Sequence, residues 1–239
     1  MNLPKMILFD YGETLLSERN IDFLRGERAV FSYLQENPRQ VTPEEVAAFG
    51  TEVFEAYGTC REKGFEIHEW PALRCKYEYF GLSFRIPLQE VEKILWTNAS
   101  EGVLMPHIAE LLDFLRENQI RVGVISNIGW SGEALSDRLH RYFPGYPFEF
   151  ILASSEYAIR KPNPWLFAIA LQKAGLSGEE VWYCGDRISA DVCGAHGAGI
   201  FPVWYKDTEE VPPTVGFEYL HIRDWREMIA ILQNIAQKQ

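Results

Sequence analysis

The stretch MILFDYGETL, residues 6–15, decides the fold. Its first four residues are apolar, and a continuous apolar run is typical of a strand that is buried on both faces of a parallel sheet. We therefore predict a strand over about residues 5–10. Asp10 ends this run and Gly12 follows two positions later. A carboxylate that ends a buried strand just before a glycine-containing turn is how an α/β protein displays a nucleophile at the edge of its sheet.

Three further polar segments follow in chain order. They are Ser126-Asn127, Lys161-Pro162, and Gly185-Asp186 with Asp191 five residues later. Ser126 and Asp186 resemble Asp10 in closing apolar, strand-like runs. Because the carboxyl ends of parallel strands lie along one edge of a sheet, we expect these side chains to meet there.

The rest of the chain alternates between strand-like and helix-like segments. After residue 102 we predict strands over 120–125, 148–152, 181–184 and 200–205, and helices over 108–118, 131–142, 163–174, from about 187 to 198, and after Asp224. This alternation predicts an α/β fold with a parallel, Rossmann-like sheet that helices cover on both faces.

The segment between the first two sheet strands has a different pattern. It lacks strand-like runs and shows amphipathic helical spacing over about 20–36, from Thr42 onward, and over 68–80 and 87–98. We therefore predict two units, an α/β core formed by residues 1–17 and 103–239, and an all-helical insert over 18–102.

Composition excludes several classes of function. The formal net charge of -11 repels polyanions, so a nucleic-acid partner is not expected. No window approaches the ~20 apolar residues of a membrane-spanning helix, and the N-terminus does not read as a signal peptide. The four cysteines show neither C-x-x-C nor zinc-type spacing. Together these features predict a cytoplasmic protein with reduced thiols and no membrane partner.

The ordered segments resemble the motifs of the haloacid dehalogenase-like (HAD) hydrolase superfamily, most of whose members are magnesium-dependent phosphatases. The insert resembles the helical C1 cap that closes over substrate in such enzymes. The resemblance implies that Asp10 is the nucleophile and that Lys161 neutralises the nucleophile and the phosphoryl group. It also implies that Ser126, Asn127 and Lys161 bind the phosphate of a small phosphorylated substrate.

The same resemblance implies one Mg²⁺ ion, held by Asp10, the backbone carbonyl of Gly12 and Asp186. Two carboxylates at neighbouring strand ends repel each other unless a cation lies between them, and Mg²⁺ prefers oxygen ligands. Asp191 would accept a hydrogen bond from metal-bound water, or it would complement the N-terminus of the following helix.

Gly12 departs from the family pattern. HAD phosphatases carry an aspartate there, which protonates the leaving group and then activates water. A positioned acid/base is worth about 10²–10⁴-fold in rate. Glu13 is not an obvious replacement, and a glycine could instead serve a turn that needs a positive φ. We expect Thr14 to steady this turn through hydrogen bonds to the backbone.

Three functions are therefore compared. The first is a phosphohydrolase that works through an aspartyl-phosphate. The second is a catalytically impaired HAD fold that binds phosphate or regulates. The third, ranked well below, is a 2-haloacid dehalogenase, which has no need of Asp186 and typically has tyrosine at the position of Gly12. In the insert, we expect His68, Glu69, Trp70 and Trp96 to pack in the core of the cap rather than face the site.

Overall fold

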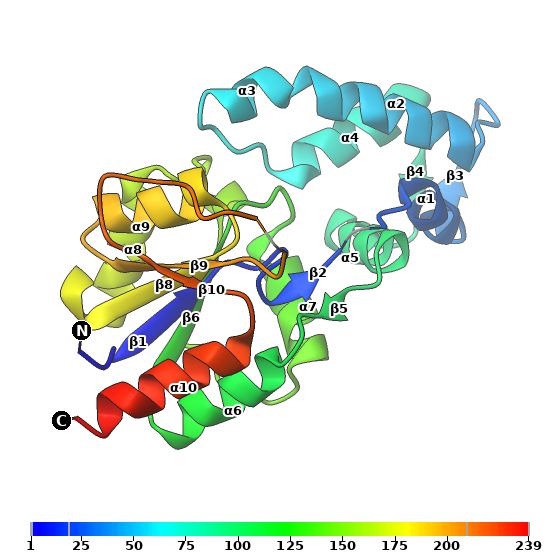
Figure 1. The fold of residues 1–239 in the computed structure, drawn as a ribbon. Coiled ribbons are helices and arrows are strands. Elements are labelled where there is room, and N and C mark those ends of the chain that lie inside the picture. The colour runs from blue at the N-terminus through cyan, green and yellow to red at the C-terminus, as the bar shows by residue number, and fades with distance from the viewer. Residues whose placement is uncertain (1, 19, 209, 239) are drawn as a thin grey trace.

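The computed structural model describes residues 2–18, 20–208 and 210–238 (Figure 1). Its core is a six-stranded sheet whose strand order is β10-β9-β8-β1-β6-β7, and every neighbouring pair is parallel. The strands are β1 (Met6–Phe9), β6 (Arg121–Ser126), β7 (Ile151–Ala153), β8 (Val181–Gly185), β9 (Phe201–Tyr205) and β10 (Leu220–Ile222). The predicted parallel α/β core is confirmed.

Strand β1 lies in the middle of the sheet, and its four side chains are completely buried. Ile7 and Phe9 pack on one face with α6 (Ile108–Glu117), α7 (Gly132–Tyr142) and α10 (Trp225–Ala236). Met6 and Leu8 pack on the other face with α8 (Pro164–Ala174) and α9 (Cys193–Gly197). Helices on both faces explain why the strand is apolar at every position instead of at alternate positions.

Local capping signals place several helix starts. Thr42 and Glu45 form the reciprocal capping box that starts α2 (Pro43–Ala56), and Asn163 caps α8. The strand predicted over 148–152 begins later, at Ile151, although the Glu149 N–H already donates to the carbonyl of Val122 at 2.8 Å.

The helical insert between β1 and β6 is confirmed. It contains α1 (Phe23–Phe31), α2, α3 (Gly58–Glu62), α4 (Glu69–Phe80) and α5 (Leu88–Ala99), which we call the cap. The predicted insert boundaries, residues 18 and 102, fall beside a small antiparallel pair formed by β2 (Leu16–Ser17) and β5 (Val103–Leu104). Figure 1 shows the cap standing over one end of the sheet.

The cap is not wholly helical, and the helix predicted over 20–36 ends at Phe31. Residues Leu34–Glu36 form β3, which pairs with β4 (Ser83–Phe84). Leu34 and Phe84 pack against the apolar core of the cap, so the side chain that suggested a longer helix is buried by strand pairing instead. That pairing joins segments about fifty residues apart, which helical spacing does not reveal.

One buried carboxylate of the cap fastens α5 to the core. The side chain of Glu92 accepts hydrogen bonds from the Ser131 N–H at 2.7 Å, the Ser131 hydroxyl at 2.6 Å and the Trp70 indole at 2.8 Å. Ser131 is the N-cap of α7, and Glu92 is 0% exposed. A buried carboxylate is tolerated here because its hydrogen bonds are made.

We predict that Glu92→Ala lowers the free energy of unfolding by about 1–3 kcal/mol, because buried donors lose their acceptor. The matched control is Glu90→Ala, an exposed position on the same helix, which should change stability by less than about 0.5 kcal/mol. Urea titrations of both variants measure the difference. Equal midpoints for the two variants would contradict the role given to Glu92.

No helix among the described residues is long and apolar enough to span a membrane.

Candidate active site

The sheet order brings the three strand-end residues together. β1 lies between β6 and β8, so Asp10, Ser126 and Asp186 emerge at the same edge. The Asp10 N–H donates to the carbonyl of Cys184 at 2.9 Å, which extends the β1–β8 pairing to the residue that carries the carboxylate. Ligand oxygens of Asp10, Asp186 and Asp191 all lie within 4.8 Å of one another.

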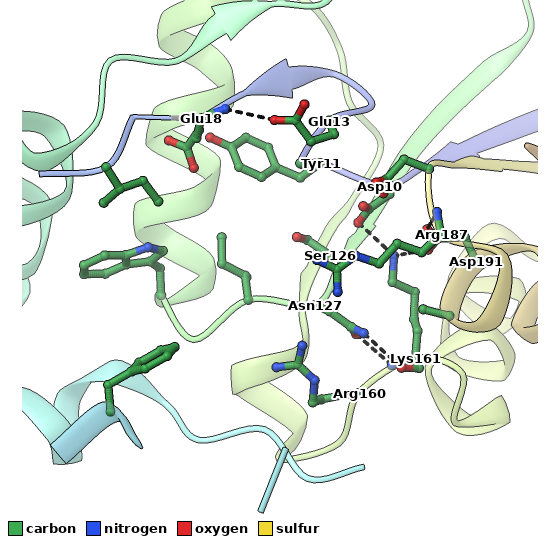
Figure 2. A pocket seen from close by; sticks show the side chains of 17 residues that line it. Asp10, Tyr11, Glu13, Glu18, Ser126, Asn127, Arg160, Lys161, Arg187 and Asp191 are labelled. Atoms are coloured by element: carbon green, nitrogen blue, oxygen red, sulfur yellow. Dashed lines mark hydrogen bonds and ion pairs between the residues drawn. The ribbon is translucent and has the colours of Figure 1, made fainter. Parts of the chain in front are cut away.

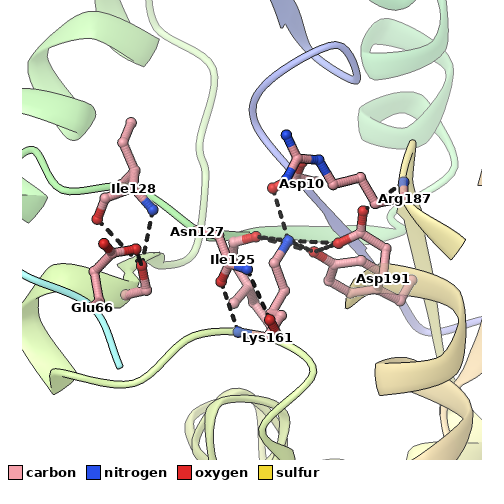
Figure 3. Close-up of polar contacts among 10 residues, drawn as sticks. Asp10, Glu66, Ile125, Asn127, Ile128, Lys161, Arg187 and Asp191 are labelled. Atoms are coloured by element: carbon pink, nitrogen blue, oxygen red, sulfur yellow. Dashed lines mark hydrogen bonds and ion pairs between the residues drawn. The ribbon is translucent and has the colours of Figure 1, made fainter. Parts of the chain in front are cut away.

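Lys161 supplies the buried cation of the site (Figure 3). Its side chain is 1% exposed, and its ammonium donates to Asp10 Oδ1 at 2.8 Å, Asp191 Oδ1 at 2.7 Å and the carbonyl of Ile125 at 2.9 Å. Burial opposes the charged form, but the two carboxylates outweigh it and raise the pKa of Lys161. The lysine therefore stays charged between two aspartates.

Asp191 and Asn127 hold this lysine in place. Asp191 uses Oδ1 for the ammonium and Oδ2 for the N–H of Arg187 at 2.9 Å, so both of its oxygens have protein partners. The amide of Asn127 donates to the Lys161 carbonyl at 2.9 Å and accepts from the Lys161 N–H at 2.7 Å. The side chain of Asn127 is thus a clamp on the backbone of Lys161.

The carboxylates carry more charge than Lys161 neutralises. Burial first, and then the charges of Asp10 and Asp191, raise the pKa of Asp186 from 3.8 to about 7. Burial also raises the pKa of Asp10, with Asp191 adding to the effect and Lys161 opposing it. Three ionised carboxylates and one ammonium leave two negative charges, which a divalent cation with a preference for oxygen would neutralise. The donor set therefore fits Mg²⁺.

In the turn after β1, the residue with a positive φ is not the glycine. Gly12 does not have a positive φ; the left-handed residue is Glu13, with φ 51°. A Cβ placed on Gly12 would meet no atom within 4 Å, so the position has room for a side chain.

The role expected of Thr14 is wrong: its hydroxyl is buried and has no hydrogen-bond partner within the described part of the chain. The backbone closes the turn instead, through bonds from the N–H groups of Leu15 and Leu16 to the carbonyl of Tyr11 at 2.9 and 3.1 Å.

A cavity of about 420 Å³ opens over these residues (Figure 2). Ser126, Asn127, Lys161 and all three aspartates line it, together with Gly12 and Glu13. From the cap, the lining includes Ile21 and Phe54. Its lining does not include His68, Glu69, Trp70 or Trp96. Trp96 is buried and stacks on Trp130 with ring centroids 5.1 Å apart, as expected of a packing residue.

Sequence reasoning missed three residues that shape the site. The hydroxyl of Tyr183, inside β8, contacts the ammonium of Lys161 and donates to the Ile125 carbonyl at 3.0 Å. The indole of Trp204 donates to the Asp186 carbonyl at 2.9 Å and so holds the backbone that carries the proposed ligand. Arg160 lines the cavity. Tyr183 and Trp204 lie within apolar strand segments, where the sequence does not distinguish them from ordinary core residues. Arg160 could have been noticed, because it directly precedes Lys161.

The fold and the arrangement of aspartates and lysine define a hydrolase class. The chain belongs to the haloacid dehalogenase-like hydrolase family, whose model matches residues 4–199.

A curated relative, the glyceraldehyde 3-phosphate phosphatase of Methanopyrus kandleri, is 26% identical over 204 residues, which are 83% of this chain and 82% of that protein.

Solved structures show the same fold. The 2-haloacid dehalogenase of Pseudomonas syringae superposes with a TM-score of 0.67 at 20% identity, over 97% of this chain and 99% of the other. The HAD hydrolase YfnB of Bacillus subtilis, solved with bound magnesium, superposes with a TM-score of 0.59 at 19% identity, over 97% and 99%.

The raised pKa of Asp186 predicts a pH dependence for the metal-free protein. Between about pH 4 and pH 7 the folded protein keeps a proton on Asp186 that the unfolded chain has lost, because the unfolded pKa is ~3.9. The stabilisation from this group is full at low pH and is lost as the pH rises through about 7. Urea unfolding in chelator at pH 5.5 and pH 8 should show this loss in the parent and a smaller loss in Asp186→Asn. Parallel pH profiles for the two proteins would contradict it.

Proposed function

We propose that this protein is a magnesium-dependent phosphohydrolase that cleaves a small phosphorylated metabolite through an aspartyl-phosphate on Asp10. The observation that carries the proposal is the Asp10 carboxylate, held by buried Lys161 at a cavity edge that also carries Asp186 and Asp191. The relative from Methanopyrus kandleri, named for a phosphatase activity on a small phosphate, supports the substrate class.

The residues divide the work as follows. An oxygen of Asp10 attacks phosphorus while the bond from phosphorus to the leaving oxygen breaks, and the leaving group departs and takes its proton from solvent. Water then attacks phosphorus, the bond to Asp10 breaks and inorganic phosphate is released, so one difficult transfer is split into two easier steps. Lys161 keeps Asp10 oriented and neutralises charge on the transferring group, while Ser126 and the backbone of Asn127 bind phosphate oxygens. The attack needs an ionised Asp10, and the buried ammonium at 2.8 Å favours that form.

Mg²⁺ would be held by Asp10, the carbonyl of Gly12 and Asp186, and when bound it would supply positive charge that neutralises the carboxylates and the phosphoryl oxygens. Asp191 would act by holding Lys161, since both of its oxygens already accept hydrogen bonds from protein groups.

Gly12 favours a second candidate function, a catalytically impaired protein that binds phosphate or regulates. The family's acid/base position has no side chain here, and Glu13 is engaged elsewhere: its carboxylate accepts from the Ser17 hydroxyl at 2.8 Å and the Glu18 N–H at 3.3 Å. The retained nucleophile and lysine favour turnover over this alternative.

We predict that phosphate release requires added Mg²⁺ and is abolished by excess chelator. Asp186→Asn should reduce metal-dependent phosphate release to background, because it removes a negatively charged ligand of the Mg²⁺ ion while conserving the shape of the side chain. The assay is phosphate release from a panel of phosphorylated metabolites. Halide release from a 2-haloacid that persists in chelator would instead identify a dehalogenase.

Without an acid at position 12, the parent should hydrolyse aryl and acyl phosphates, whose leaving groups depart unaided, faster than alkyl esters. Gly12→Asp should raise alkyl-ester turnover by about 10²–10⁴-fold if the new carboxylate reaches the leaving oxygen. The open space around Gly12 and its ordinary φ allow the variant to fold.

Gly12→Asn is the matched control, because it fills the same space without supplying a base. Fast alkyl-ester hydrolysis by the parent, with no gain in a folded Gly12→Asp, would show that another residue supplies the acid.

A further inference from the structure

A guanidinium lies on the wall of the active-site cavity, away from the carboxylates. It belongs to Arg160, which precedes Lys161 in the loop before α8 and lines the cavity. Its side chain is 18% exposed. Figure 2 shows the Arg160 guanidinium below Asn127, well separated from Asp10.

The cap fixes Arg160 in this position. Glu66, in the loop between α3 and α4, has a completely buried side chain whose Oε2 accepts from Arg160 Nη1 and from the Ser154 hydroxyl, the latter at 2.8 Å. The backbones are joined as well, because the Arg160 N–H donates to the Gly64 carbonyl at 3.0 Å and the Glu66 N–H donates to the Ala158 carbonyl at 3.2 Å. Figure 3 shows Glu66 beside Ile128, the residue that directly follows the Ser126-Asn127 pair.

The charges around Arg160 do not cancel. Glu66 also pairs with Arg61, whose Nε lies 3.4 Å from its Oε1, so one carboxylate faces two guanidinium groups. At the other end of the cavity, the ammonium of Lys161 faces two carboxylates. Glu66 alone therefore does not neutralise both guanidinium groups, and of the two only Arg160 lines the described cavity.

The acidic side chains of the cavity outside the aspartate cluster are held elsewhere. Glu13 accepts from Ser17 and Glu18, and the Glu18 carboxylate accepts from Arg138 and from the Ser100 hydroxyl at 2.9 Å. In Figure 2 both glutamates lie on the far side of Asp10 from Arg160. They do not neutralise the guanidinium.

We propose that Arg160 binds a second anionic group of the substrate, a carboxylate or a second phosphate, at the end remote from the phosphoryl group on Asp10. This inference rests on the proposed function. It makes the preferred substrates phosphomonoesters whose leaving group is itself an anion. A guanidinium presents several N–H donors in a plane that matches such groups, and only one is used by Glu66. Glu66 is a positioning residue.

The experiment compares two pairs of compounds that differ in this anion. The first pair is 3-phosphoglycerate and glycerol 3-phosphate, and the second is propane-1,3-diol bisphosphate and its monophosphate. For each protein, the ratio of kcat/KM within a pair reports recognition of the second anion. A general structural defect would lower both members equally and leave the ratio unchanged.

In the parent, kcat/KM should be higher, in at least one pair, for the member that carries the second anion. The pair that shows this preference identifies carboxylate or phosphate as the group bound. Arg160→Gln should reduce that ratio by about 10- to 100-fold, the effect of losing a charged hydrogen bond. Arg160→Lys should retain part of it. Arg74→Gln, which removes an exposed positive charge of α4, is the matched control and should leave the ratio unchanged.

Several results would overturn the proposal. One is a parent without preference in either pair, and another is an Arg160→Gln ratio equal to that of the parent. A third is collapse of the ratio in Arg187→Gln alone, which would assign recognition to the other arginine of the cavity wall.

If none of the four compounds releases phosphate, the proposed hydrolysis of such esters fails, and calorimetric binding of the same pairs to the parent and to Arg160→Gln tests Arg160 separately. The inference is supported if the parent binds the member with the second anion more strongly and Arg160→Gln loses this preference. It is overturned if the parent binds both members of each pair equally.

Discussion

The site depends on one buried ion pair network, in which the ammonium of Lys161 lies between Asp10 and Asp191. Removing these charges from water is unfavourable by several kcal/mol per ion, so the arrangement persists only when each group has its partners. The ammonium donates to two carboxylates, the Ile125 carbonyl and the Tyr183 hydroxyl. This requirement forces the ends of β1, β6 and β8 and the loop that carries Lys161 to meet at one point.

The same principle explains how the cap is attached. Glu66 and Glu92 are both completely buried, and both reach across from the cap to hydrogen-bond donors of the core. Either carboxylate would lose its hydrogen bonds to the core if the segments it joins were displaced slightly, and would keep only its partner within the cap, Arg61 for Glu66 and Trp70 for Glu92. The docked cap is therefore a specific arrangement held by hydrogen bonds. Through the side chain of Glu66, the cap also holds Arg160 and, by way of Ser154, the loop after β6.

Gly12 lies beside the carboxylate cluster, at a position with room for a side chain. The structure places a charged lysine beside a carboxylate cluster suited to a divalent cation, and it leaves open space around Gly12. Nothing in the backbone requires glycine there, since the strained φ belongs to Glu13. The conformation of this turn therefore does not explain the glycine at position 12.

The sequence by itself determined the sheet core, the sheet edge at which Asp10, Ser126 and Asp186 meet, and the presence of a helical insert. Continuous apolar runs such as residues 6–9 can only be buried on both faces, and capping residues such as Thr42 and Asn163 mark helix starts locally. The meeting of Asp10 and Asp186 was likewise foreseeable, because strand ends in a parallel sheet share an edge.

Only the tertiary structure decided which long-range partners each side chain found. Leu34 paired with Phe84, Asn127 clamped the backbone of Lys161, and Glu66 joined Arg160 across 94 positions of sequence. These contacts depend on how the elements pack, and spacing along the chain carries no information about them. For the same reason the sequence did not single out Ile21 and Phe54, which packing placed on the cavity wall.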